Sequence, residues 1–90
     1  MKYRKKPVVI EAVQYTGKTM AMADVPQWLI DAMFDRTVRP STDENAKELK
    51  VSTLEGVRTV SVDDWIIREI NGEIYPCKPD IFADTYEAAE

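Results

Sequence analysis

The chain has 90 residues with one cysteine and no histidine, and its formal net charge at pH 7 is −4. This length predicts one domain over residues 1–90, and a single cysteine excludes an intrachain disulfide and predicts a reducing compartment. The absence of histidine excludes Ser–His and Cys–His catalysis, as well as zinc sites built on Cys and His.

Charge is distributed unevenly along the sequence. Residues 1–6 hold four basic side chains and no acid, whereas the rest of the chain holds all 16 acidic side chains and only eight of the 12 basic ones. An acidic body disfavours nucleic acid, whose phosphates need a positive surface. The basic start is interpreted as a solvated arm, with an arm that binds phosphate or a partner as the alternative. No signal peptide and no membrane-spanning run is predicted.

The first two elements are predicted to be a strand and a helix. Residues 8–16 carry strand-forming side chains, with apolar residues on both faces near the start, which predicts a largely buried strand. Residues 23–35 have apolar side chains three or four positions apart, which predicts a helix with one buried stripe. Asp24 is the expected N-cap, and Gln27 completes a capping box. The stripe consists of Val25, Trp28, Leu29, Ala32 and Met33.

A short strand is expected at residues 37–39, and a meander of four strands from residue 48 onward. The first two strands of the meander are expected to be joined by a two-residue loop at Glu55-Gly56. That loop aligns two apolar pairs, namely Val51 with Val60 and Leu49 with Val62. Asp63-Asp64 is interpreted as a corner, because adjacent acids are frequent turn residues and two carboxylates are too few for a hard cation.

The last two strands are predicted to form a hairpin around Asn71-Gly72 through a two-residue type I′ turn. This register aligns two notable pairs: Cys77 with Ile66, and Arg68 with Tyr75, where a cation–π contact is expected. Cys77 is therefore interpreted as a small buried side chain. The alternative is a nucleophile, which needs a lowered thiol pKa.

Two prolines shape the end of the fold. Pro76 lacks an N–H donor, which predicts a sheet edge or a strand covered by the closing helix. Pro79 suits the first position of a final helix that packs Ile81, Phe82 and Tyr86 on the sheet. The order of elements indicates an α+β fold, with a mostly antiparallel sheet of N-terminal strand plus C-terminal meander and two helices.

Three stretches of the sequence are distinctive: KYRKKPVVIEAVQYTG (residues 2–17), TLEG (53–56) and DWIIREINGEIYPCKPDIFADTYE (64–87). They resemble a family of small proteins found in tailed phages and prophages. In that family the corner before the penultimate strand commonly reads Gly-Asp, where this chain has Asp63-Asp64. The resemblance implies a phage or prophage origin and action in the bacterial host cytoplasm, and it implies no activity or catalytic residue.

Three functions are compatible with these observations. The favoured one is a non-enzymatic accessory protein that binds a host or phage protein, or a further copy of itself. The second is a binder of a small anionic, nucleotide-like ligand, with aromatic help from Trp65 or Tyr75. Its candidate contacts are Arg4, Lys5, Lys6 and Lys78. The third and least favoured is an enzyme with Cys77 as nucleophile. No phosphate loop or nucleophile elbow is present, so no cofactor, metal or catalytic residue is expected.

Overall fold

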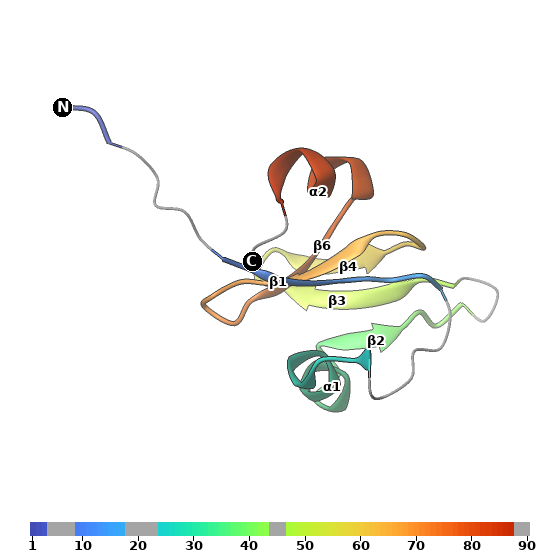
Figure 1. Ribbon diagram of the computed structural model, residues 1–90. Helices are drawn as coiled ribbons and strands as arrows, with labels where there is room; N and C mark the ends of the chain where they lie inside the picture. The colour runs from blue at the N-terminus through green and yellow to red at the C-terminus, as the bar shows by residue number, and fades with distance from the viewer. Residues whose placement is uncertain (4–8, 18–23, 44–46, 88–90) are drawn as a thin grey trace.

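The computed structural model describes residues 1–3, 9–17, 24–43 and 47–87. Within those ranges it contains six strands and two helices (Figure 1). In chain order they are β1 (Glu11–Gln14), α1 (Gln27–Phe34), β2 (Val38–Pro40), β3 (Leu49–Thr53), β4 (Gly56–Val60), β5 (Trp65–Arg68), β6 (Ile74–Cys77) and α2 (Pro79–Thr85). The α+β class and the predicted order of elements are confirmed.

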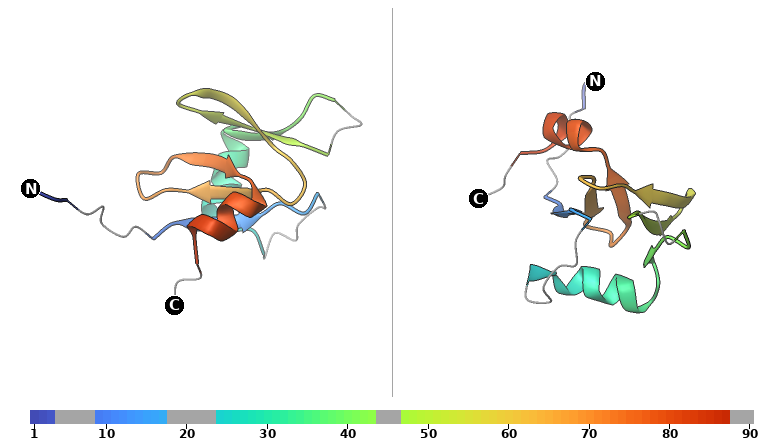
Figure 2. Two further views of the ribbon diagram at one scale, coloured as in Figure 1. Left: turned by 90° about the horizontal axis from the view of Figure 1, so that it is seen from above. Right: turned by 90° about the vertical axis from the view of Figure 1, so that its right-hand side faces the viewer.

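The strands form two antiparallel sheets of three strands each, in the orders β1-β5-β6 and β2-β3-β4. The single meander predicted from residue 48 is therefore wrong, because the chain changes sheet after β4. The two sheets lie between the helices, with α1 on one side and α2 on the other (Figure 1). The right-hand view in Figure 2 shows the same arrangement from the side. The predicted edge position of the last strand is confirmed, since β6 lies at the edge of its sheet.

The change of sheet occurs at the corner formed by residues 61–64. The Asp64 N–H donates to the Ser61 carbonyl at 3.0 Å, and Asp63 has a φ of 75°. Tyr15 faces both aspartates: its carbonyl accepts from the Asp63 N–H at 2.7 Å, and its N–H donates to the Asp64 carbonyl at 2.8 Å. Asp63 and Asp64 therefore lie opposite the single residue Tyr15, which is a β-bulge, and a β-bulge bends and twists the strand. After this bulge the chain continues into β5, which pairs with β1 and not with β4.

The core lies between α1 and the two sheets. Seven buried side chains form it: Val25, Leu29 and Ala32 from the α1 region, Val38, Val51 and Val60 from the second sheet, and Ile66 from β5. The predicted helical stripe is thus confirmed for its buried members, whereas Met33 is exposed. The predicted capping box is wrong, because α1 begins at Gln27 with Pro26 as N-cap and has no side-chain cap. The Pro26 carbonyl accepts from the Leu29 N–H at 3.0 Å instead.

The β3–β4 hairpin has a different register from the predicted one. Its two-residue loop is Leu54-Glu55, so that Thr53 pairs with Gly56 and Leu49 pairs with Val60. Gly56 has a φ of 116°, and its carbonyl accepts from Thr53 Oγ1 at 2.7 Å. Leu49, Val51 and Val60 still share one face, but Val62 lies beyond the strand and is exposed.

The β5–β6 hairpin has a three-residue loop, not the predicted two-residue turn. The Glu69 N–H donates to the Glu73 carbonyl at 2.9 Å, and Gly72, with a φ of 88°, donates to the Glu69 carbonyl at 2.8 Å. This is the loop geometry in which a turn is followed by a glycine in the left-handed region. The register is therefore shifted by one residue, which moves side chains to the other face.

This shift overturns two predicted contacts. Cys77 lies opposite Trp65, not Ile66, and Arg68 lies opposite Ile74. Arg68 and Tyr75 therefore point to opposite faces of the sheet, so the predicted cation–π contact between them is wrong. The first strand also differs from the prediction, because β1 spans four residues and is half-buried at the other edge of its sheet.

The helix α2 covers the outer face of the β1-β5-β6 sheet. The Phe82 ring stacks on Trp65 with ring centroids 4.0 Å apart and an interplanar angle of 7°. Tyr86 contacts Phe82 at a centroid distance of 5.2 Å. Ile81 is exposed, contrary to the prediction that it packs on the sheet. The sheet between the helices is consequently apolar on both faces, with Ile66 toward the core and Ile67 toward α2, each almost fully buried.

Candidate functional site

Lys78, one of the four cations predicted to contact an anionic ligand, is the N-cap residue of α2. Its Nζ donates to Asp64 Oδ2 at 3.1 Å, and the same oxygen accepts from the Ser61 N–H at 2.9 Å. The Asp64 side chain is 4% exposed, whereas the Lys78 side chain is 58% exposed. Lys78 therefore neutralises a buried carboxylate and ties the corner at residues 61–64 to the start of α2. Its role as a ligand contact stays a prediction.

Of the other predicted ligand contacts, the structure describes only the two aromatic residues, Trp65 and Tyr75. Arg4, Lys5 and Lys6 lie outside the described residues. Trp65 is covered by Phe82. The Tyr75 hydroxyl donates to Glu69 Oε1 at 2.8 Å and lies 3.4 Å from the Tyr86 hydroxyl. Burial, together with these two hydrogen bonds, raises the pKa of Tyr75, so the hydroxyl stays protonated and serves the packing of α2.

Cys77 is a half-buried residue at the end of β6, and its thiol donates to the Lys78 carbonyl at 3.6 Å. Burial raises the pKa of the Cys77 thiol, and the nearby carboxylates of Asp64 and Asp80 raise it further. A reactive cysteine needs the opposite environment, one that stabilises the thiolate. The surroundings of Cys77 therefore do not favour the interpretation of this residue as a nucleophile.

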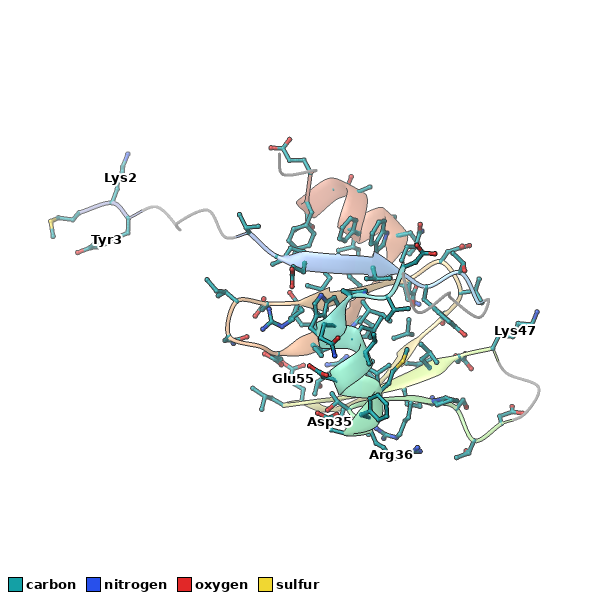
Figure 3. All side chains as sticks on the ribbon, turned by 60° about the horizontal axis from the view of Figure 1, so that its bottom comes forward. Lys2, Tyr3, Asp35, Arg36, Lys47 and Glu55 are labelled. Carbon is teal, nitrogen blue, oxygen red and sulfur yellow. The ribbon has the colours of Figure 1, made fainter. Side chains whose placement is uncertain are left out.

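A groove of about 660 Å³ lies between α1 and the turns of the two hairpins. Its lining combines apolar side chains with carboxylates. The apolar part includes Trp28, Ala32, Leu54 and Ile74, and the carboxylates are Asp31, Asp35 and Glu73. We call this surface the α1 groove. Asp35, which is labelled in Figure 3, lies at the C-terminal end of α1.

The carboxylates of the α1 groove form no ion pair with any residue that the structure describes. Three ion pairs occur among the described residues: Arg58 with Glu55, Arg68 with Glu11, and Lys78 with Asp64. Asp31 instead accepts from Gln27 Nε2 at 2.9 Å. Hydrogen bonds from Thr37 hold the pKa of Asp35 below its ordinary value, so this carboxyl is ionised at neutral pH. Arg68, the cation in the lining, is shared with Glu11, and the groove is therefore net negative.

A second groove, of about 360 Å³, lies beside the same hairpins, and its lining includes Glu55, Arg58, Glu69, Glu73 and Tyr75. Most of these carboxylates already have partners within the chain. Glu55 pairs with Arg58, and Glu69 accepts from the Tyr75 hydroxyl. This groove therefore offers a partner less unpaired charge than the α1 groove does.

Among the residues that the structure describes, no group of three or more His, Cys, Asp or Glu side chains is arranged to hold a metal ion. None of the helices in the described ranges combines the length and apolarity needed to cross a bilayer.

The residues of the α1 groove form no motif in the sequence. They come from α1, from the β3–β4 turn and from the β5–β6 hairpin, so only the folded chain brings them together. Trp28 was expected in the core, and it does pack against the core while also lining the groove. Comparisons with models of known protein families, with curated proteins and with solved structures gave no match.

Proposed function

We propose that this chain is a non-enzymatic phage or prophage accessory protein, and that it binds a basic segment of a protein partner in the α1 groove. One observation supports this binding site: the lining combines apolar side chains with three carboxylates that have no ionic partner in the described part of the chain. The phage origin and the action in the bacterial host cytoplasm are supported by the resemblance of residues 2–17 and 51–87 to the phage family.

The carboxylates and the apolar side chains of the groove contribute to binding in different ways. Carboxylates at a rim accelerate the encounter with a basic partner and select against acidic ones. The affinity itself comes mainly from apolar anchors that are desolvated on binding, among which tryptophan is over-represented. Trp28 and Ile74 can supply this contact, because both are only half-buried in the chain by itself.

A small anionic ligand is favoured less by the same observations. The lining of the α1 groove is net negative and would repel such a ligand. Lys78 has a carboxylate partner already. This alternative therefore depends on Arg4, Lys5 and Lys6, and it predicts that a triphosphate nucleotide binds the wild-type protein but not a variant with these three residues changed to alanine.

The proposed function is tested by isothermal titration with two synthetic probe peptides, acetyl-KKLKK-amide and its acidic counterpart acetyl-EELEE-amide. We expect the protein to bind the basic peptide alone. The double change Asp31→Asn and Glu73→Gln should weaken this binding about tenfold, since each exposed ion pair contributes about 0.5–1 kcal/mol.

The matched control is the double change Asp80→Asn and Asp84→Asn, which removes the same charge from exposed positions on α2. It should leave the dissociation constant of the basic peptide unchanged. Equal weakening by both variants would mean that only the overall charge matters, and the absence of any binding would refute the proposal.

A further inference from the structure

The sequence contains a basic segment of the kind that the α1 groove suits. Residues 1–8 include four of the 12 basic side chains together with Met1 and Tyr3. Of the described residues in this segment, Met1 and Tyr3 are 106% and 87% exposed. Lys2 and Tyr3 extend away from the body of the molecule (Figure 3). The sequence of the segment therefore offers four cations, and its described part adds two large side chains that the single chain leaves uncovered, Met1 and Tyr3.

The segment leaves the body of the protein close to the α1 groove. Glu11, the first residue of β1, pairs with Arg68 through an Oε2–Nη1 distance of 3.5 Å, and Arg68 lines the groove. The N-terminal end of β1 and the β5–β6 turn lie on the same side of the molecule (Figures 1 and 2). Eight extended residues reach about 26 Å, which is enough to cross from one copy to a groove on a neighbouring copy.

The charges of the two parts are complementary. Lys2, Arg4, Lys5 and Lys6 carry four positive charges, and the groove has three carboxylates without a cationic partner among the described residues. In a symmetric pair of chains, each copy can provide one basic segment and one groove, so both segments are bound and the assembly is closed.

We infer that two copies of this chain associate by exchanging residues 1–8, and that each segment occupies the α1 groove of the other copy. The inference rests on the proposed function, since it names the partner of the same groove. A second copy is favoured over the groove of the same chain because Met1 and Tyr3 remain exposed when the chain is alone.

Sedimentation velocity on full-length variants tests the exchange through its charges. The arm variant carries Arg4→Glu, Lys5→Glu and Lys6→Glu, and the groove variant carries Asp31→Lys and Glu73→Lys. We expect wild-type dimers at low ionic strength whose dissociation constant rises at least about tenfold at high ionic strength. Each variant alone should be monomeric, because its segment and its groove repel each other.

An equimolar mixture of the two variants should form heterodimers, because the acidic segment of one fits the basic groove of the other, and the reverse pair also fits. Far-ultraviolet circular dichroism checks that each variant is folded, and Asp80→Lys with Asp84→Lys is the matched control that should remain dimeric. A monomeric wild type, a dimer that persists in the arm variant, or a mixture that stays monomeric would each overturn the exchange.

The failure of this inference can be separated from the failure of the proposed function. The peptide acetyl-KKLKK-amide is titrated into the variant with Arg4, Lys5 and Lys6 changed to alanine, which has no basic segment to occupy the groove and no acidic segment to bind the peptide. If the peptide binds there while the wild type is monomeric, the groove binds basic partners but the partner is not a second copy. If the peptide does not bind, the proposed function is wrong, and any dimer must form through another surface.

Discussion

The acidic side chains on the two sides of the sheets differ in their burial and in their partners. On the α2 side, Asp64 is buried and its Oδ2 atom accepts from both Ser61 and Lys78. On the α1 side, Asp31 and Glu73 line an open groove and form no ion pair with any described residue. A buried carboxylate contributes to stability through its hydrogen bonds, whereas exposed carboxylates contribute little. The comparison teaches that Asp64 has a structural role, whereas the carboxylates of Asp31 and Glu73 are available to a partner.

The largest effect is expected from Asp64→Ala. This change removes the acceptor of the Ser61 N–H and leaves Lys78 unpaired, and it should lower the free energy of unfolding by about 1–3 kcal/mol. Denaturation in urea measures this difference. Asp31→Ala is the matched control on the groove side and should change the free energy by less than about 0.5 kcal/mol. Equal losses in the two variants would remove the distinction between the two sides.

A second effect concerns the thiol of Cys77 beneath α2. Because burial raises its pKa, the thiolate is scarce at neutral pH and becomes frequent only above the range of an ordinary cysteine. Alkylation by iodoacetamide in the native protein should be at least about fivefold slower than in denaturant. The rate should still be rising at a pH where a free thiol has reached its plateau. Native labelling as fast as in the denatured chain would instead indicate an activated cysteine.

A smaller effect is expected at the corner between the two sheets. Asp63 has a φ of 75°, a conformation that costs about 1–2 kcal/mol for most residues and less for aspartate. Asp63→Gly should therefore raise the free energy of unfolding by up to about 1 kcal/mol. Asp63→Ala removes the carboxylate but keeps a Cβ atom, so it should not raise the free energy of unfolding. An equal increase in both variants would mean that the loss of charge, and not the backbone conformation, causes the effect.

The order of elements could be predicted from the sequence, but the strand registers could not. The stripe of α1 follows from the spacing of Val25, Leu29 and Ala32, which is a local pattern. In contrast, β5 has Ile66 and Ile67 buried on opposite faces, so its hydrophobic pattern is equally consistent with two registers. The length of the loop decides between these two registers, and Asn71-Gly72 is compatible with both a two-residue and a three-residue loop.

The candidate site could not be predicted from the sequence either. The predicted ligand contacts were chosen by charge along the chain, whereas the α1 groove is assembled from Asp31, Thr53 and Glu73, which are distant in sequence. The arrangement of the two hairpins beside α1 brings these residues together, and the chain changes sheet at the corner where Asp63 has a positive φ. An aspartate in the left-handed region is less frequent than glycine, so the sequence contains no strong signal for this corner.

The central claim is that the α1 groove binds basic segments, and amide chemical-shift mapping tests it most directly. The ¹⁵N-labelled variant with Arg4, Lys5 and Lys6 changed to alanine is titrated with acetyl-KKLKK-amide. We expect the perturbed amides to be those of the groove, including Asp31, Thr53 and Gly72, while the amides of Asp80 and Asp84 on α2 stay unchanged. Perturbations centred on α2, or spread evenly over the surface, would contradict the claim.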